Sequence, residues 1–205
     1  MNLYFDKIFI IMNLKGPVWL MQPIPYFGEE LNFDEWLWEP KIDGWRMQVI
    51  KYGKNEIEFF GRRLESNPNW TKKLSYLIDI VNKFLPEYTL LDCELYSCSG
   101  RRFIPSLFTN QPKVEPLIYV FDIIFYRDEF IGKCILKERR KILEEIRFIK
   151  PFFLLSQNKI KNLSLALNES VRQGNEGIVI KNIYSEYKVS KDGPIATEWW
   201  RKIKR

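Results

Sequence analysis

The chain has 205 residues, of which 46% are hydrophobic and 28% charged, and its formal net charge is +6. This composition is typical of a globular protein, and no apolar run reaches the roughly 18 residues that a membrane-spanning helix needs. The absence of histidine excludes a histidine general base, a Ser-His-Asp triad and imidazole-based zinc sites. Three cysteines are a poor zinc set, so any metal has to be bound by carboxylates, which favours Mg²⁺ or Mn²⁺.

Residues 1–15 are expected to be a disordered lead-in or a misassigned start, with Met12 as an alternative initiator. The apolar run at 8–12 is too short for a secretory signal and lacks a cleavage site, so we expect a cytoplasmic protein with reduced cysteines. The rest of the first forty residues is rich in Pro, Gly and aromatic residues and predicts an irregular segment that covers part of a sheet. A positive net charge is compatible with a polyanionic partner, and equally with an ordinary solubilising surface.

Residues 45–63 predict a β-hairpin, because apolar and polar residues alternate on both sides of a turn signal at 53–55. Asn67-Pro68 is typical of a helix start, and apolar residues at helical spacing predict a helix up to Pro86. Strands are predicted at 89–97 and 117–126, helices at 136–148 and 163–173, and two last strands at 176–182 and 198–205. This order favours a single α+β domain over 1–205, with largely antiparallel sheets flanked by helices.

The segment from Glu39 to Arg46 reads EPKIDGWR. Its Lys-x-Asp-Gly pattern alone is weak, since a turn before a strand, with Lys41 as a solvated charge, explains it as well.

Five further segments change this balance: FFGRRLESN, LLDCELY, YVFDIIFY, NEGIVIKN and WWRKIK. With EPKIDGWR they resemble, in order, the motifs of the covalent nucleotidyltransferase superfamily, which includes ATP-dependent DNA ligases, RNA ligases and mRNA capping enzymes. The stretch after YVFDIIFY is similar to DNA ligases in particular. The resemblance implies an ATP-grasp-like nucleotidyltransferase domain that uses ATP as AMP donor, with Mg²⁺ or Mn²⁺, to seal nicks in duplex DNA, as in DNA repair.

The resemblance also implies a role for each matching residue. Lys41 is the nucleophile, Glu39 and Ile42 bind the nucleotide, and Phe121 stacks on adenine. Arg46 and Arg62 contact the nucleotide or the incoming 5′-phosphate. The remaining implied residues are a ribose- and metal-binding carboxylate, a second metal-associated carboxylate, and phosphate-facing lysines: Glu94, Glu176, Lys181, Lys202 and Lys204.

Residue chemistry is consistent with these roles. A lysine amine attacks phosphorus only in its neutral form, which neighbouring cations and partial burial favour. The same cations can stabilise charge on the transferring phosphate.

Each role has a structural alternative. Phe121 could be a core residue, Asp92 and Glu94 a solvated strand face, and Lys202 with Lys204 a frayed basic tail. The roles of Arg63 and Asp122 stay open, and Asp122 could be structural.

Ligases of this family continue into an OB-fold domain beyond the last motif, whereas this sequence stops at Arg205. We therefore expect slow self-adenylation, weak nick binding, and a partner protein that supplies the missing function. An RNA ligase, a capping-type guanylyltransferase, and a nucleotide- or nucleic-acid-binding module without turnover remain the alternatives.

Overall fold

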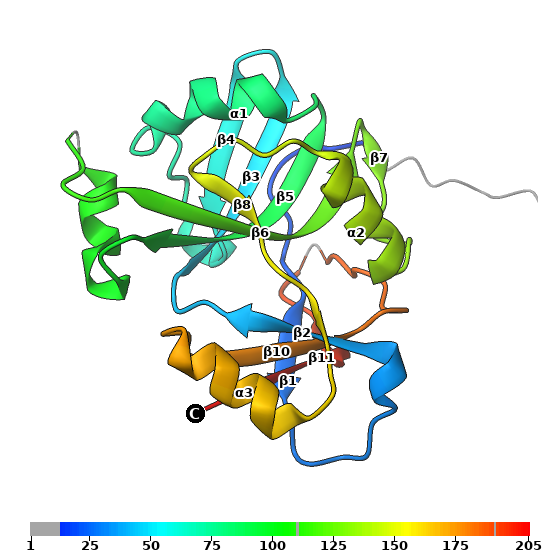
Figure 1. The fold of residues 1–205 in the computed structure, drawn as a ribbon. Helices are drawn as coiled ribbons and strands as arrows, with labels where there is room; N and C mark the ends of the chain where they lie inside the picture. The colour runs from blue at the N-terminus through cyan, green and yellow to red at the C-terminus, as the bar shows by residue number, and fades with distance from the viewer. Residues whose placement is uncertain (1–12, 110, 191) are drawn as a thin grey trace, which may run out of the picture.

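The computed structural model describes residues 13–109, 111–190 and 192–205. Two sheets lie one above the other in Figure 1. The upper sheet has the strand order β4-β3-β5-β6-β7, with β8 paired to β6. Its strands are β3 (Trp45–Gly53), β4 (Glu56–Gly61), β5 (Thr89–Ser97), β6 (Pro116–Tyr126), β7 (Glu129–Phe130) and β8 (Phe152–Leu154).

The lower sheet has the order β1-β11-β10-β2-β9. Its strands are β1 (Gln22–Pro25), β2 (Trp36–Lys41), β9 (Asn158–Lys159), β10 (Gly177–Asn182) and β11 (Ala196–Lys204). Of the pairings in the two sheets, β1 with β11 and β6 with β8 are parallel and the others antiparallel. The prediction of an α+β fold with largely antiparallel sheets is therefore confirmed.

Helices cover both sheets (Figure 1). They are α1 (Ile78–Phe84), α2 (Leu136–Glu145) and α3 (Leu163–Arg172). Short 3₁₀ turns lie at Phe33–Glu35, Leu64–Ser66, Ser75–Leu77 and Arg101–Phe108. Helix α1 packs on β4, α2 on β6, and α3 on β10 and β2. The expected hairpin and the expected helices at 136–148 and 163–173 are present.

Two sequence predictions are wrong. The segment after residue 15, expected to be irregular up to about residue 40, instead supplies β1 and β2, and β2 lies between β10 and β9 within the lower sheet. Asn67 does not start a helix: it ends the 3₁₀ turn at Leu64–Ser66 in a left-handed conformation with φ 44°. The following backbone pairs with β4 instead, through Gly61 N–H to Pro68 O and Trp70 N–H to Phe59 O. That pairing delays the α-helix to Ile78.

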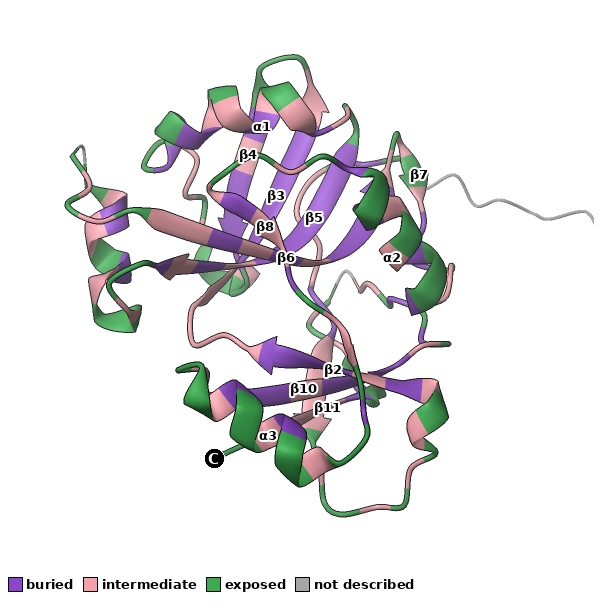
Figure 2. Cartoon of the chain, in the orientation of Figure 1, coloured by how far each residue is buried: buried purple, intermediate pink, exposed green. Residues whose placement is uncertain are grey.

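Figure 2 shows burial concentrated along the central strands of both sheets. The largest cluster joins the upper sheet to α1, α2 and the turn at Arg101–Phe108. A second cluster lies between the lower sheet and α3, where Trp36 and Trp38 are buried. A third cluster includes Leu14, Tyr187 and Trp200, and joins the N-terminal segment to the chain between β10 and β11. Trp200 of this cluster, and Phe121 packed against it, also line the site described next.

Of the lead-in expected over residues 1–15, residues 1–12 lie outside the described residues. Leu14, within the described part, is buried, and its N–H donates to Asp128. Within the described residues, no helix combines the length and apolar character needed to cross a membrane.

Candidate active site

A cavity of about 840 Å³ opens between the two sheets. Strands β2, β10 and β11 line it from the lower sheet, and β3, β5 and β6 from the upper sheet. Every residue nominated from the sequence lines this cavity: Glu39, Lys41, Ile42, Arg46, Arg62, Glu94, Phe121, Glu176, Lys181, Lys202 and Lys204. Glu39 and Lys204, which are 165 positions apart in the sequence, thus line the same cavity.

Lys41 lies at the end of β2, and its Cα is paired with that of Gly177 on β10. This register brings Glu176 beside it, and Glu176 N–H donates to Lys41 O at 2.9 Å. The Glu176 carboxylate forms ion pairs with both Lys41 Nζ and Lys204 Nζ. Burial alone would raise the pKa of Glu176, but the hydrogen bonds from Lys204 and Lys41 lower it below its ordinary value. The candidate nucleophile is therefore held by an ionised carboxylate inside a cationic cluster.

Gly44 fits a close backbone approach. A Cβ on Gly44 would lie 2.4 Å from Leu95 O, so only glycine allows the chain to pass β5 at this point. The passage starts β3 in a register that pairs Arg46 with Glu94. Burial raises the pKa of Glu94 to about 7, against the lowering influence of the Arg46 and Lys41 charges.

Arg46 is clamped by a carboxylate that sequence reasoning did not assign. Its Nε and Nη2 donate to the two oxygens of Asp92 at 2.9 and 2.6 Å. The guanidinium carbon lies 5.3 Å from the centre of the Phe121 ring. Burial alone would lower the pKa of Arg46, but the charge of Asp92 outweighs it and raises the pKa above its ordinary value. Because Asp92 is fully buried, the reading of Asp92 and Glu94 as a solvated strand face is wrong.

Lys181 and Glu39 form a buried ion pair at 2.8 Å at the inner end of the cavity. The second Glu39 oxygen accepts from Gln157 Nε2 at 2.7 Å. Lys181 Nζ also lies 4.8 Å from the Phe121 ring centre and 4.0 Å from that of Trp200. Both groups are thus fixed before any ligand arrives.

Lys202 and Lys204 lie on β11 within the lower sheet, so the reading of this pair as a frayed tail is wrong. They alternate along the strand with Arg201 and Ile203, whose side chains lie on the opposite face. Arg201 forms an ion pair with Glu29, and Ile203 packs against the cluster between the lower sheet and α3. Arg62 and Arg63 lie exposed at the rim.

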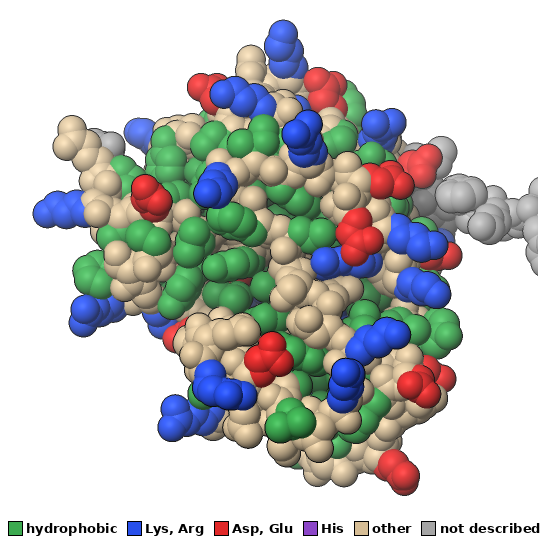
Figure 3. All heavy atoms as spheres, viewed as in Figure 1, with side chains coloured by type: hydrophobic (Ala, Val, Ile, Leu, Met, Phe, Trp, Pro, Cys, Tyr) green, Lys and Arg blue, Asp and Glu red, His purple; other side chains and the backbone are tan. Residues whose placement is uncertain are grey.

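Charge gathers in this cavity more than on the outer surface. On the face shown in Figure 3, Lys and Arg side chains are spread over the molecule with Asp and Glu among them. The positive net charge therefore gives no single patch on that face, whereas the cavity brings together Lys41, Arg46, Lys202 and Lys204.

Two further buried polar groups lie near the site, and the sequence analysis named only the first of them, as a residue that could be structural. Asp122, left open there, is fully buried and binds Arg139 through two hydrogen bonds of 2.7 and 2.9 Å. It does not line the cavity. Tyr187 lies between β10 and β11, and its hydroxyl donates to Asp92 at 2.6 Å. No periodicity marks Tyr187 in the sequence, because it belongs to an irregular segment.

Comparisons with known proteins agree on one family. Residues 21–204 match the model of the ATP dependent DNA ligase domain. The DNA ligase of Methanocella arvoryzae is 29% identical over 73% of this chain and 29% of its own length. A probable DNA ligase of Persephonella marina is 30% identical over 82% of this chain and 31% of its own length. The chain thus spans about a third of the length of these relatives.

The fold agrees as well. A mycobacterial DNA ligase D, solved in complex with ATP and MES, superposes with a TM-score of 0.66 at 19% identity, over 91% of this chain and 60% of the other. At this identity the likeness shows the fold alone. Since the family model spans residues 21–204, nearly all of the described residues, the chain belongs to the ATP dependent DNA ligase domain family.

Proposed function

We propose that this chain transfers AMP from ATP to Lys41, and from Lys41 to the 5′-phosphate at a nick in duplex DNA, where the 3′-hydroxyl then closes the strand. The observation that carries this proposal is the position of Lys41 Nζ, which faces Glu176 inside a cavity that also holds Arg46, Lys202 and Lys204. These cations match the charge of a triphosphate, and the family match agrees with ATP as the donor.

In the first step the lone pair of Lys41 Nζ attacks the α-phosphorus of ATP. A nitrogen–phosphorus bond forms, the bond from the α-phosphorus to the bridging oxygen breaks, and pyrophosphate leaves with that electron pair. The amine must lose a proton to attack. Glu176, in contact with Nζ, is the acceptor that the cavity offers. Lys202 and Lys204 balance the charge that develops on the phosphates.

The nucleoside is expected deeper between the sheets. Phe121 offers a ring to the base, and Val179 of β10 lines the same volume. Glu39, with Ile42 nearby, meets the edge of the base, because Lys181 and Gln157 hold the Glu39 carboxylate in place. An aromatic ring and a fixed polar edge together suit a flat heterocycle.

A magnesium ion fits the donor set. Glu94 and Glu176 both line the cavity, and no group of three or more metal-binding side chains occurs among the described residues. Mg²⁺ in nucleotide enzymes is commonly held by one or two carboxylates together with substrate phosphates. When bound, it would neutralise phosphate charge and orient the leaving group.

In the second step an oxygen of a DNA 5′-phosphate attacks the phosphorus of the lysine adduct, and Lys41 recovers its electron pair and a proton. In the third, the 3′-hydroxyl gives up its proton to water and its oxygen bonds to the 5′-phosphorus, while the bond from that phosphorus to the bridging oxygen breaks and AMP leaves with the electron pair. Arg62 and Arg63, exposed at the rim, lie where an incoming strand end would pass. The names of the relatives support DNA as substrate. A partner protein that assists these steps, and a cytoplasmic location, stay predictions.

The test of the first step is the intact mass of the purified chain after incubation with ATP and Mg²⁺. We expect one added AMP, removed by pyrophosphate. Lys41→Ala should show no adduct, while Lys161→Ala, an exposed lysine outside the cavity, should match the parent chain. An adduct that persists in Lys41→Ala would contradict the assignment of the nucleophile.

The later steps need nicked DNA. Chain already carrying AMP, freed of ATP, should join a labelled 5′-phosphate to a 3′-hydroxyl in a single turnover. Nicked RNA and GTP in parallel arms decide between DNA and RNA, and between ATP and GTP. Joining of RNA in preference to DNA would refute the proposed substrate and leave the lysine chemistry intact.

A further inference from the structure

Asp92 lies between two partners that come from different parts of the chain. One side is the guanidinium of Arg46, which binds both Asp92 oxygens. The other is the hydroxyl of Tyr187, 2.6 Å from Asp92 Oδ2. The side chains of Asp92 and Tyr187 are almost completely buried, so water cannot replace either contact.

The direction of these hydrogen bonds is fixed by chemistry. The Tyr187 oxygen receives Met21 N–H at 3.2 Å and Arg46 Nη2 at 3.3 Å, and both of these groups can only donate. The Tyr187 proton therefore points to Asp92. Burial, and then the charge of Asp92, raise the pKa of Tyr187 well above its ordinary value, so the hydroxyl keeps this proton.

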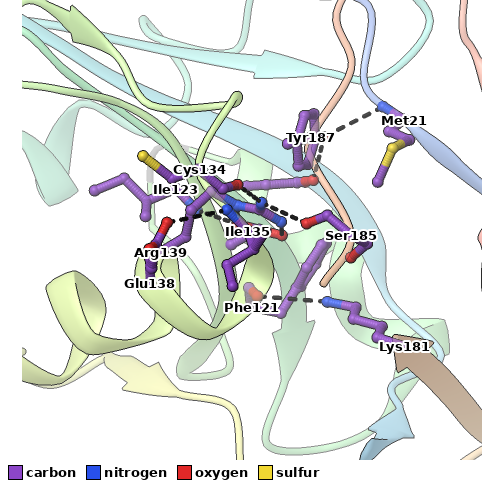
Figure 4. A network of polar contacts seen from close by, with 12 residues as sticks. Met21, Phe121, Ile123, Cys134, Ile135, Glu138, Arg139, Lys181, Ser185 and Tyr187 are labelled. Atoms are coloured by element: carbon purple, nitrogen blue, oxygen red, sulfur yellow. Dashed lines mark hydrogen bonds and ion pairs between the residues drawn. The ribbon is translucent and has the colours of Figure 1, made fainter. Parts of the chain in front are cut away.

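Tyr187 makes further contacts, and Figure 4 shows its hydroxyl bound to the backbone of Met21. Its N–H donates to Gly132 O at 2.7 Å, next to the start of α2. The Arg139 guanidinium lies 5.8 Å from the centre of its ring, and the Trp200 ring meets it edge-on at 5.6 Å. The phenol is thus tied to the upper half of the molecule although it follows β10 of the lower sheet.

Arg46 presents its free edge to the cavity as a result. Nε and Nη2 are engaged by Asp92, and Nη1 has no hydrogen-bond acceptor among the described residues. The Nη1 edge is left for an anionic ligand, while the guanidinium lies over Phe121. A carboxylate held by one partner alone could rotate about its last torsion and turn the guanidinium with it.

We propose that Tyr187 is a positioning residue: through Asp92 it fixes the guanidinium of Arg46 so that Nη1 faces the phosphate of the bound nucleotide and the ring plane of Phe121 stays set. This inference rests on the proposed nucleotide chemistry for its ligand, and on the contacts of Tyr187, Asp92 and Arg46 for its geometry. Arg46 touches the ligand, whereas Tyr187 acts through Asp92.

The test uses Tyr187→Phe in the whole chain, which removes one hydroxyl and keeps the ring. We expect the maximal rate of Lys41 adenylation to fall about tenfold, the size of one lost hydrogen bond to a charged group. Tyr52→Phe is the matched control, because the Tyr52 hydroxyl also donates to a carboxylate, Glu58 at 2.9 Å, away from the cavity. That variant should keep the parent rate.

To distinguish positioning of Arg46 from a purely structural role of Tyr187, Tyr187→Phe is repeated in a chain that carries Arg46→Lys. Lysine keeps the positive charge but cannot form the two-point contact with Asp92. In that background Tyr187→Phe should alter the rate less than about twofold. An equal loss in both backgrounds would overturn the proposal.

Crystal structures of the parent chain and of Tyr187→Phe give a readout that does not depend on activity. A rotated Asp92 and a displaced Arg46 guanidinium are expected, and an unmoved guanidinium overturns the proposal. If the parent chain forms no AMP adduct, the proposed function fails, and this structural comparison still decides the role of Tyr187.

Discussion

Replacement of Asp122 by Asn tests whether this carboxylate is structural. Asp122 and Arg139 are both completely buried and joined by two hydrogen bonds. Arg139 Nη1 also donates to the carbonyls of Cys134 and Ser185, so the guanidinium cannot leave with its charge. Asn would leave that charge uncompensated and place an N–H₂ group against the Arg139 donors.

The expected loss is about 3–5 kcal/mol of unfolding free energy, the usual cost of breaking a buried pair. For a chain of this size each kcal/mol corresponds to about 2–4 °C, so the Tm should fall by about 6–20 °C. Circular dichroism during urea and thermal unfolding measures both. The control is Glu144→Gln, on the same helix as Arg139. The ion pair of Glu144 with Arg140 is half exposed and contributes less than about 0.5 kcal/mol to stability. Equal small losses in the two variants would refute the reasoning.

Two further predictions concern the cavity. The pKa of Glu94 in the folded chain is about 7, above its ordinary value of 4.5. Between these two values the folded chain binds more protons than the unfolded chain. Its free energy of unfolding therefore falls by up to about 3 kcal/mol as the pH rises across this range. Urea unfolding of the metal-free chain at about pH 5 and about pH 8 should show this loss relative to Glu94→Gln, and parallel pH profiles would contradict it. Gly177→Ala should destabilise the chain by at least about 1–3 kcal/mol and slow adenylation, because its Cβ would meet Ile203 O at 2.1 Å beside Lys41. Gly193→Ala, with no atom within 4 Å of its Cβ, should match the parent chain in the same assays.

Local pattern predicted the regular elements well where one face is buried. The strand predicted at 89–97 matches β5 residue for residue. The predicted helix after Asn67 failed because the backbone at Pro68 and Trp70 is used by β4, which the local sequence does not show. Strand β2 was missed because it lies in a stretch rich in Pro, Gly and aromatic residues, which suggests an irregular segment, while pairing to β10 decides its conformation.

The residues nominated from motif order all line the cavity, but the groups that hold them in place were not nominated. Asp92 and Arg46 are 46 positions apart, and Asp92 and Tyr187 are 95 apart. Burial of such groups depends on how the two sheets approach each other, and neither charge nor spacing encodes that approach. Sequence reasoning could therefore name the residues around the cavity without finding the groups that hold them.

The strand order also has a consequence for biosynthesis. The upper sheet is built from one continuous stretch, from Trp45 in β3 to Leu154 in β8. The lower sheet joins β1 to β11 in parallel, with Gln22 opposite Ala196, so it cannot close until the last strand has been translated. We expect the upper sheet to form first on the nascent chain, whereas the tryptophans of β2 become buried only after β10 and α3 have been translated. The cavity, which needs both sheets, is then the last part of the molecule to mature.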